Sequence, residues 1–210
     1  MKPLADRCCP VCRADAPQPL NQRRFAQLPG LDGAGYTQQL AACGGCGALY
    51  VTAYLDPHDL AHYYASMSSY EYLVSDGEFP AEERLRSERQ VAFLGPYLSP
   101  SVPSQVLDVG CSIGHTLHLL AQRGHQVRGI EPSQALSDIA RARYGVAVDT
   151  TFVDEDSALP GGQHLVLLSH VLEHLLQPHT MLSAIRRALR PDGLLFIEVP
   201  AIELFDERDL

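Results

Sequence analysis

The sequence predicts an α/β protein in which a small metal-stapled module precedes a doubly wound, mainly parallel sheet. Two observations carry this prediction. Two Cys-x-x-Cys pairs lie near the N-terminus, and an apolar run at 105–109 leads into a glycine-containing loop and an amphipathic segment. That second pattern is typical of a buried parallel strand followed by a crossover helix. We expect a zinc-binding module at 1–55, a helical, tyrosine-rich connector at 56–103 and the α/β domain at 104–210.

Composition and charge narrow the partners. The 210-residue chain is 46% hydrophobic and 20% charged, and its net charge is −9. An acidic protein repels a phosphate backbone, which disfavours nucleic acid as the main substrate. No apolar run approaches the roughly 20 residues that cross a bilayer, and Met1–Arg7 lacks the apolar part of a secretory signal. We therefore expect a cytoplasmic protein with no membrane partner; the sequence leaves the oligomeric state open.

The N-terminal cysteines predict a structural zinc site. Cys9 and Cys12 form one knuckle, Cys43 and Cys46 form a second about thirty residues on, and four thiolates complete a tetrahedral Zn²⁺ shell. Cys8 is an alternative to Cys9, which is preferred because it gives the two-residue gap. Redox-active or unliganded cysteines are further alternatives, but a redox pair normally lies where a strand meets a helix.

The connector is predicted to contain two helices. The first begins at Pro57, with Asp56 in the N-cap position. Tyrosines and serines dominate 63–72, where the rings either face a cleft or pack in a half-buried layer. A second helix runs from Pro80 toward Pro100. Its apolar side chains are expected to point into a core: Val91, Phe93, Leu94 and Tyr97.

The loop after the first α/β strand predicts a nucleotide-containing cofactor. The strand at 105–109 meets a loop with Gly110 and Gly114, and a second strand at 126–130 is followed by Glu131. In open α/β sheets such a ligand lies across the carboxyl ends of adjacent strands, where glycines let it approach the backbone. An acidic residue after the second strand accepts hydrogen bonds from the ribose hydroxyls.

The composition of this loop favours S-adenosylmethionine over a dinucleotide. The dinucleotide fingerprint is Gly-x-Gly-x-x-Gly, whose helix N-terminus receives a pyrophosphate. Here Ser112 stands between Gly110 and Gly114, and Asp108 precedes them. A carboxylate aimed into the loop attracts an ammonium-bearing ligand and repels a diphosphate. An NAD-dependent oxidoreductase is the nearest enzymatic alternative.

Three motifs in the right order resemble the class I S-adenosylmethionine-dependent methyltransferases. Val106–Gly114 resembles their motif I, Ser169–Leu175 the segment after their fourth strand, and Pro191–Ile197 the turn into their fifth. The resemblance implies a Rossmann-like domain. The chain is also similar to a bacterial group that includes nucleotide-sugar C-methyltransferases, which carry a further large C-terminal domain. It implies methyl transfer to a small-molecule or sugar acceptor.

The family's cofactor residues carry over position by position. The motif I loop cradles the methionine part and the acid after the second strand holds the ribose. The implied cofactor-binding residues are Asp108, Gly110, Cys111, Gly114 and Glu131. The adenine amine is assigned to Asp154, with Glu155 and Asp156 as alternatives.

His170 is the candidate catalytic base, because the unperturbed pKa of histidine lies near working pH. Local packing is the alternative, and alignment of the reactants alone is also sufficient for methyl transfer. His170–His174 also matches the His-x-x-Glu-His pattern of inverted zinc metalloproteases. That interpretation is rejected, because the segment directly follows a predicted buried strand and a third ligand is missing.

The predicted sheet is shorter than the family's. Five strands are expected, at 105–109, 126–130, 146–150, 164–169 and 194–199, with helices between the first three and before the last. The family adds an antiparallel hairpin, for which too few residues follow Pro200. We therefore expect a truncated chain or a gene fragment. A zinc module fused to a non-catalytic Rossmann remnant is the non-enzymatic alternative.

Overall fold

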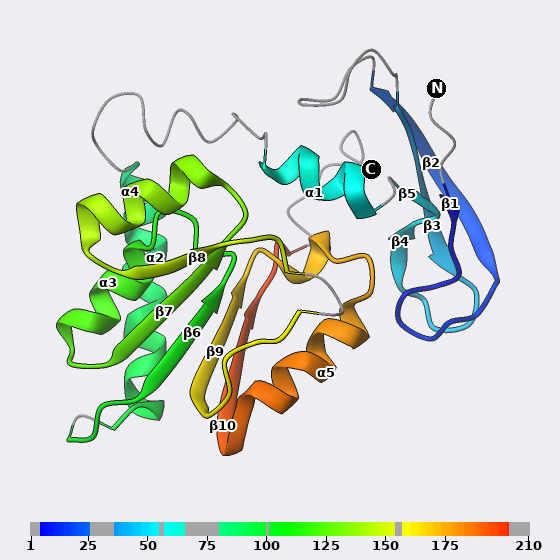
Figure 1. The fold of residues 1–210 in the computed structure, drawn as a ribbon. Coiled ribbons are helices and arrows are strands. Elements are labelled where there is room, and N and C mark those ends of the chain that lie inside the picture. The colour runs from blue at the N-terminus through cyan, green and yellow to red at the C-terminus, as the bar shows by residue number, and fades with distance from the viewer. Residues whose placement is uncertain are drawn as a thin grey trace.

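The computed structural model places a small β module beside an α/β domain (Figure 1). It describes residues 5–25, 36–54, 57–65, 80–99, 101–153 and 157–201. None of the described helices combines the length and the apolar character needed to span a bilayer.

The N-terminal module consists of short antiparallel strands. Its strands are β1 (Ala5–Asp6), β2 (Pro17–Phe25), β3 (Tyr36–Cys43), β4 (Leu49–Val51) and β5 (Ala53–Tyr54). The order β2-β3-β4 makes a three-stranded sheet, and β1 pairs with β5. The buried core of the module is small, and two of its members are cysteines: Cys9, Ala41, Cys43 and Tyr50.

The second domain contains a five-stranded, all-parallel sheet in the order β10-β9-β6-β7-β8. Its strands are β6 (Gln105–Val109), β7 (Gln126–Glu131), β8 (Ala147–Thr150), β9 (Gln163–Ser169) and β10 (Leu189–Glu198). The predicted fold class is confirmed. β10 starts before the predicted 194, because Leu189 also pairs with Gln163 before the register shifts at Leu194.

Helices cover both faces of this sheet. They are α2 (Ala81–Leu94), α3 (His115–Gln122), α4 (Gln134–Tyr144) and α5 (Pro178–Ala188). A further helix, α1 (Pro57–Ala65), lies beyond the carboxyl ends of the strands (Figure 1), and short 3₁₀ helices span Gly95–Tyr97 and Leu172–His174. One core joins α2, α3 and α4 to one face of the sheet, and a second core joins α5 to the other. Neighbouring β6 residues such as Val106 and Leu107 belong to opposite cores, as strand geometry requires.

The predicted core face of α2 is partly wrong. Val91 and Leu94 are buried, but Phe93 and Tyr97 are each 58% exposed. A helix turns 100° per residue, so Val91 and Leu94 share a face with Gln90, while Phe93 points away from that face. The exposed Phe93 ring packs at its edges against Tyr97 and Phe196.

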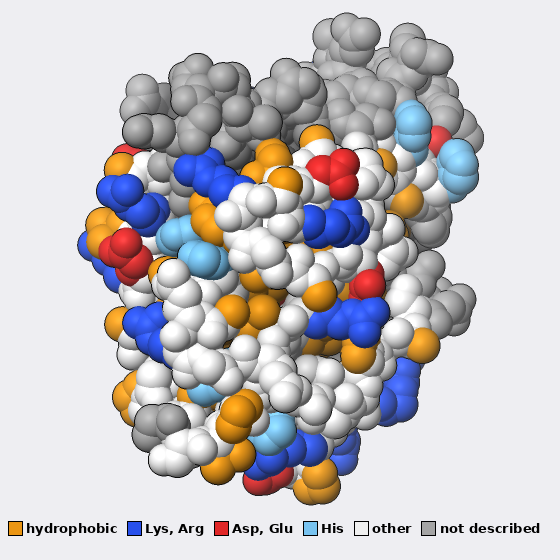
Figure 2. All heavy atoms as spheres, turned by 60° about the vertical axis from the view of Figure 1, so that its left-hand side comes forward, with side chains coloured by type: hydrophobic (Ala, Val, Ile, Leu, Met, Phe, Trp, Pro, Cys, Tyr) orange, Lys and Arg blue, Asp and Glu red, His pale blue; other side chains and the backbone are white. Residues whose placement is uncertain are grey.

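The topology of the sheet provides a place for a ligand at one edge. Chain order reverses at β6, which lies between β7 and β9, and such a switch point opens a crevice at the carboxyl ends of the strands. Figure 2 shows the helical face on the left of Figure 1, where arginine, acidic and histidine side chains are dispersed among apolar and uncharged ones.

Candidate active site and candidate zinc site

The loop after β6 is tightly curled. Gly110, Ser112 and Gly114 all have positive φ, at +78°, +51° and +75°. A Cβ on Gly110 would lie 2.5 Å from Cγ2 of Val171, and one on Gly114 would lie 2.8 Å from Cγ2 of Val146. Glycine is therefore needed at both positions for backbone conformation and for close packing of the loop against its neighbours.

Glu131, at the end of β7, ties this loop to the next one. Its Oε2 accepts a hydrogen bond from the Ser112 amide at 3.0 Å, and its Oε1 accepts one from the Ser133 amide at 2.9 Å. Burial raises the pKa of Glu131, and these two amide bonds oppose the rise. Because a carboxylate oxygen accepts more than one hydrogen bond, both oxygens retain capacity for a ligand hydroxyl.

Asp108 is a second buried carboxylate in the same corner. It is only 6% exposed. Burial raises the pKa of Asp108 to about 7, the negative charge of Glu131 adds to the rise, and Arg86 opposes it. A ligand that brings a positive charge into this corner would relieve the repulsion between the two carboxylates.

A cavity of about 900 Å³ opens at the carboxyl ends of β6, β7 and β9. Gly110, Glu131 and His170 line it, each directly after or at the end of a different strand. A smaller cavity of about 40 Å³ shares lining residues with it and is lined by Asp108 and Cys111 among others. Arg86 lines both cavities, and its guanidinium is paired with Glu83.

Two of the other expected cofactor residues have a different environment. The Cys111 side chain packs in the core between sheet and helices and lies close to Gly129, and burial raises its pKa far above the usual range. Gly114 begins α3 and is on the lining of neither cavity. Asp154, with its alternatives Glu155 and Asp156, lies outside the described residues; the neighbouring Phe152 and Val153 line the large cavity.

His170 lies at the cavity wall in an uncommon backbone conformation. Its φ is +54°, and its amide donates to the Glu198 carbonyl at 2.8 Å. Its Nδ1 is 3.5 Å from Oε1 of Glu173, which leaves Nε2 for another partner. His174 belongs to a 3₁₀ turn that excludes His170. The two histidines therefore do not share an α-helical face, which agrees with rejection of the metalloprotease interpretation.

A partly buried hydrogen-bond network centred on Gln90 was not predicted. Gln90 of α2 donates through Nε2 to Ser169 Oγ at 2.7 Å and also to the Glu198 carboxylate. Its Oε1 accepts from Thr116 Oγ1 at 2.9 Å, and Ser169 Oγ donates to Glu198 Oε2 at 2.8 Å. A glutamine within the apolar stripe of α2 was the only sequence signal for this network.

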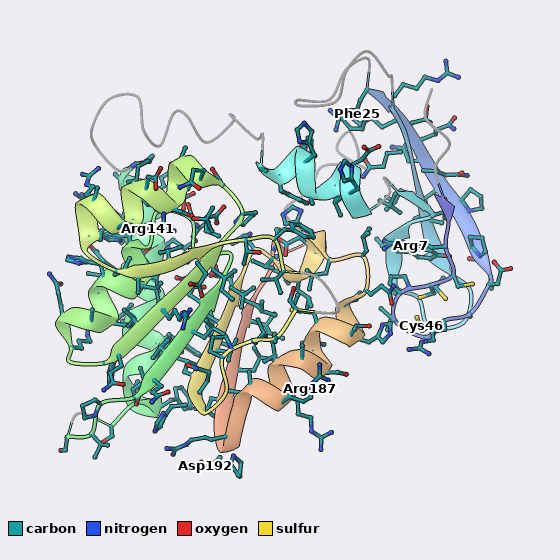
Figure 3. All side chains as sticks on the ribbon, in the orientation of Figure 1. Arg7, Phe25, Cys46, Arg141, Arg187 and Asp192 are labelled. Atoms are coloured by element: carbon teal, nitrogen blue, oxygen red, sulfur yellow. The ribbon has the colours of Figure 1, made fainter. Side chains whose placement is uncertain are left out.

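The four predicted zinc ligands form a cluster. All four Sγ atoms lie within 4.8 Å of one another, with Cys9 and Cys46 at 3.7 Å and Cys12 and Cys43 at 3.5 Å. Zinc–sulfur bonds of about 2.3 Å in a tetrahedron place sulfurs about 3.8 Å apart, so the residues fit this ion. Cys8 is exposed and outside the cluster. Figure 3 shows the sulfur atoms gathered beside Cys46.

Backbone amides support thiolates in this cluster. The Gly45 amide donates to Cys43 Sγ at 3.3 Å. Burial raises the pKa of Cys9, but hydrogen bonds from the backbone of Cys12 and Val11 and from the Cys43 and Cys46 thiols outweigh it and lower the pKa to about 6; contacts with the neighbouring thiols raise the pKa of Cys12 in turn. Thiolate is the form that binds a metal ion, so these bonds favour occupancy of the site.

Known proteins share parts of this chain. The ubiquinone biosynthesis O-methyltransferase of Idiomarina loihiensis is 27% identical over 151 residues, which cover 68% of this chain and 60% of that protein. The C-methyltransferase NovU of Streptomyces niveus is 30% identical over 99 residues, which cover 45% of this chain and 24% of that protein. The chain thus spans less than two thirds of either relative.

Solved structures agree on the fold. The magnesium protoporphyrin IX methyltransferase of Synechocystis superimposes with a TM-score of 0.52 at 20% identity, covering 65% of this chain and 73% of that one. A family described as methyltransferase domain matches residues 81–210, more than half of the chain and all of its parallel sheet. The resemblance expected from the three motifs is confirmed, and the chain belongs to the methyltransferase-domain family.

Proposed function

We propose that this protein transfers the methyl group of S-adenosylmethionine to a small-molecule or sugar acceptor. The observation that carries the proposal is the pairing of Glu131 with the curled loop after β6, beside Asp108, at the switch point of the sheet. Two acidic groups and a left-handed glycine turn suit a cationic nucleoside. The relative from Synechocystis was solved with bound S-adenosylmethionine, which supports the same cofactor here.

Each end of the cofactor has a candidate partner in this chain. Glu131 would accept hydrogen bonds from the ribose hydroxyls, and Phe152 would face the adenine from the cavity wall. Arg86, which lines both cavities, would bind the carboxylate of the methionine part, while Asp108 would attract its ammonium. When bound, S-adenosylmethionine supplies an electrophilic methyl group on a positively charged sulfur.

His170 is proposed to accept the proton that the acceptor loses. Glu173 faces its Nδ1 and would keep a proton there, so that Nε2 is the basic nitrogen. The proton that the acceptor loses on methylation would pass to Nε2 of His170. Positioning of acceptor and cofactor in one cavity would supply a further part of the rate enhancement.

Apolar side chains in the cavity lining support an acceptor with an apolar or aromatic body. Leu60 and Tyr64 of α1 and Leu175 and Leu176 line the cavity. Tyr64 stacks on the Phe152 ring, with centroids 6.2 Å apart, and forms an edge contact with His174. The relatives named for ubiquinone biosynthesis and for C-methylation are consistent with a small-molecule acceptor.

The four-cysteine cluster is proposed to hold a structural Zn²⁺. Four protein sulfurs leave no position for a water or substrate, which is the arrangement of structural zinc sites. The metal would stabilise a module whose own apolar core is small.

A crystal structure with S-adenosylhomocysteine tests the proposed function. The proposal expects ribose density within hydrogen-bond distance of both Glu131 oxygens and the ligand carboxylate beside Arg86. A ligand bound elsewhere, or side chains that fill the 900 Å³ cavity in the crystal, would contradict it.

A further inference from the structure

Arg7 links the N-terminal module to the wall of the cavity. Its Nη1 donates to the carbonyl of Leu176 at 2.9 Å, and its Nε donates to the carbonyl of Val51 at 2.8 Å. Its own amide donates to the Thr52 carbonyl at 2.9 Å. The guanidinium therefore joins the end of β4 to the segment that follows β9; Figure 3 labels Arg7 on the side of the N-terminal module that faces the second domain.

Arg13 makes a second link, on the other side of the first cysteine knuckle. Its Nη2 lies 2.7 Å from Nε2 of His179, near the start of α5. Arginine only donates, so Nε2 of His179 accepts this hydrogen bond. Arg13 directly follows Cys12, has a φ of +62°, and its amide donates to the Cys9 carbonyl at 2.9 Å. The knuckle turn therefore sets the direction of this side chain.

Both links end on the same wall. Leu175, Leu176 and Gln177 line the 900 Å³ cavity, and His179 follows them on the first turn of α5. Each arginine lies within two residues of a cysteine of the first knuckle, Cys9 or Cys12. The geometry of the knuckle and the position of the cavity wall are thus joined by two short, charge-assisted contacts.

We propose that the N-terminal module is a brace for the cavity wall, with Arg7 and Arg13 as positioning residues. Metal at the four cysteines orders the knuckle, the knuckle holds the two guanidinium groups, and these hold 175–179 against the cavity. The module thus supports the site from outside it and contacts no reacting atom. The proposal rests on the proposed function only for what the cavity binds.

Hydrogen exchange of the full chain tests the brace. The measured segment is 171–181, in which the amides of His174 and Met181 have carbonyl partners. The test variant combines Arg7→Ala with Arg13→Asn, since asparagine tolerates positive φ. We expect exchange in this segment to rise about fivefold or more, because losing charged hydrogen bonds favours local opening. The matched control is Arg24→Ala, an exposed arginine on β2.

Zinc removal supplies the second arm. A chelator should speed exchange in 171–181 of the unmodified chain, and should add little in the double variant, whose links are already lost. If the double variant loses its metal, Arg7→Lys replaces it, because lysine keeps the charge but lacks the fork that reaches two carbonyls. Unchanged exchange in 171–181 in the variants, or after chelation, would overturn the brace. If the unmodified chain does not bind S-adenosylhomocysteine, the proposed function is overturned instead.

Discussion

Asp108 and Glu131 share one buried corner beneath the loop after β6, and their charges repel. Each is less than a tenth exposed. The shared cause of their raised pKa values is burial, and for Asp108 the charge of Glu131 adds to it. Folding this corner costs free energy when no ligand is bound, and a cationic ligand recovers part of that cost. Functional sites commonly retain such strain at the expense of stability.

Asp108→Asn should therefore stabilise the unliganded protein at alkaline pH. The pKa of Asp108 is about 7 when folded against 3.8 as the ordinary value, so the unfolded chain loses this proton first as pH rises. The penalty grows between pH 4 and 7 and is complete above 7; it reaches roughly 4 kcal/mol at most. Urea unfolding should show a larger gain for Asp108→Asn at pH 8 than at pH 5. Equal gains in the free energy of unfolding at pH 5 and pH 8 would contradict a raised pKa for Asp108.

Glu131→Ala should weaken S-adenosylhomocysteine binding about tenfold to a hundredfold, since hydrogen bonds to a charged group are worth about 1.5–3 kcal/mol. It also leaves the amides of Ser112 and Ser133 without their carboxylate partner. Calorimetric titration measures the change, with Glu88→Ala, an exposed acid on α2, as the control. An affinity equal to that of the control would place the ribose elsewhere.

For single residues, the sequence predicts the chemical type of a site residue better than the direction in which its side chain points. Gly110 and Glu131 could be placed at the cavity because their positions at strand ends are set by strand length. The packing of the Cys111 side chain in the core could not be predicted, because the direction of a loop side chain depends on φ and ψ in the loop. Gln90 lay in the helical stripe assigned to apolar packing, so its polar role needed the positions of three other elements.

At the scale of elements, Gln90 joins α2 to α3, β9 and β10. Its hydrogen bonds end on Thr116, Ser169 and Glu198. The backbone of Glu198 in turn accepts the amide of His170, so the same network fixes where the segment after β9 begins. A buried network of this kind stabilises only while every member is satisfied.

Gln90→Leu should lower the free energy of unfolding by about 1–3 kcal/mol, because Glu198 and Thr116 lose a buried partner. Urea denaturation measures the effect. Arg89→Leu, at the neighbouring exposed position of α2, controls for the added apolar side chain. A Gln90→Leu protein as stable as that control would show that the network adds nothing to stability.

The elements themselves follow closely from the sequence. Four of the five parallel strands begin within one residue of the predicted position, and β10 is the exception. In β10, Leu189 already pairs with β9, and the register then shifts before Leu194. The alternation of side chains along a strand does not predict such a shift. Phe93 and Tyr97 were assigned to the core by their chemistry, whereas the angle of α2 turns Phe93 away from the face of Val91 and Leu94, and Tyr97 lies in the 3₁₀ helix that follows α2.

At the scale of the whole molecule, the N-terminal module and the α/β domain have apolar cores of very different size. The α/β domain buries two apolar clusters, one on each face of its sheet, while the N-terminal module buries a single small one. A core of that size does not support a fold without a staple. The knuckle spacing predicted this staple, but the contacts of Arg7 and Arg13 with the α/β domain depend on tertiary placement that the sequence does not encode locally.

Chelation should release one zinc ion per chain and unfold the module while the parallel sheet and its helices persist. A metal-indicator assay counts the ion, and limited proteolysis with circular dichroism follows the module and the α/β domain separately. We expect cleavage within 5–54 and retention of most helical signal, since the long helices belong to the α/β domain. Release of no zinc, or loss of the entire helical signal, would contradict this division of stability.

Calorimetric titration of the unmodified chain with S-adenosylhomocysteine and, separately, with NAD⁺ tests the central claim most directly. If the corner of Asp108 and Glu131 receives an ammonium-bearing nucleoside, S-adenosylhomocysteine binds with one site per chain and NAD⁺ does not bind. Binding of NAD⁺ alone, or of neither ligand, would contradict the account.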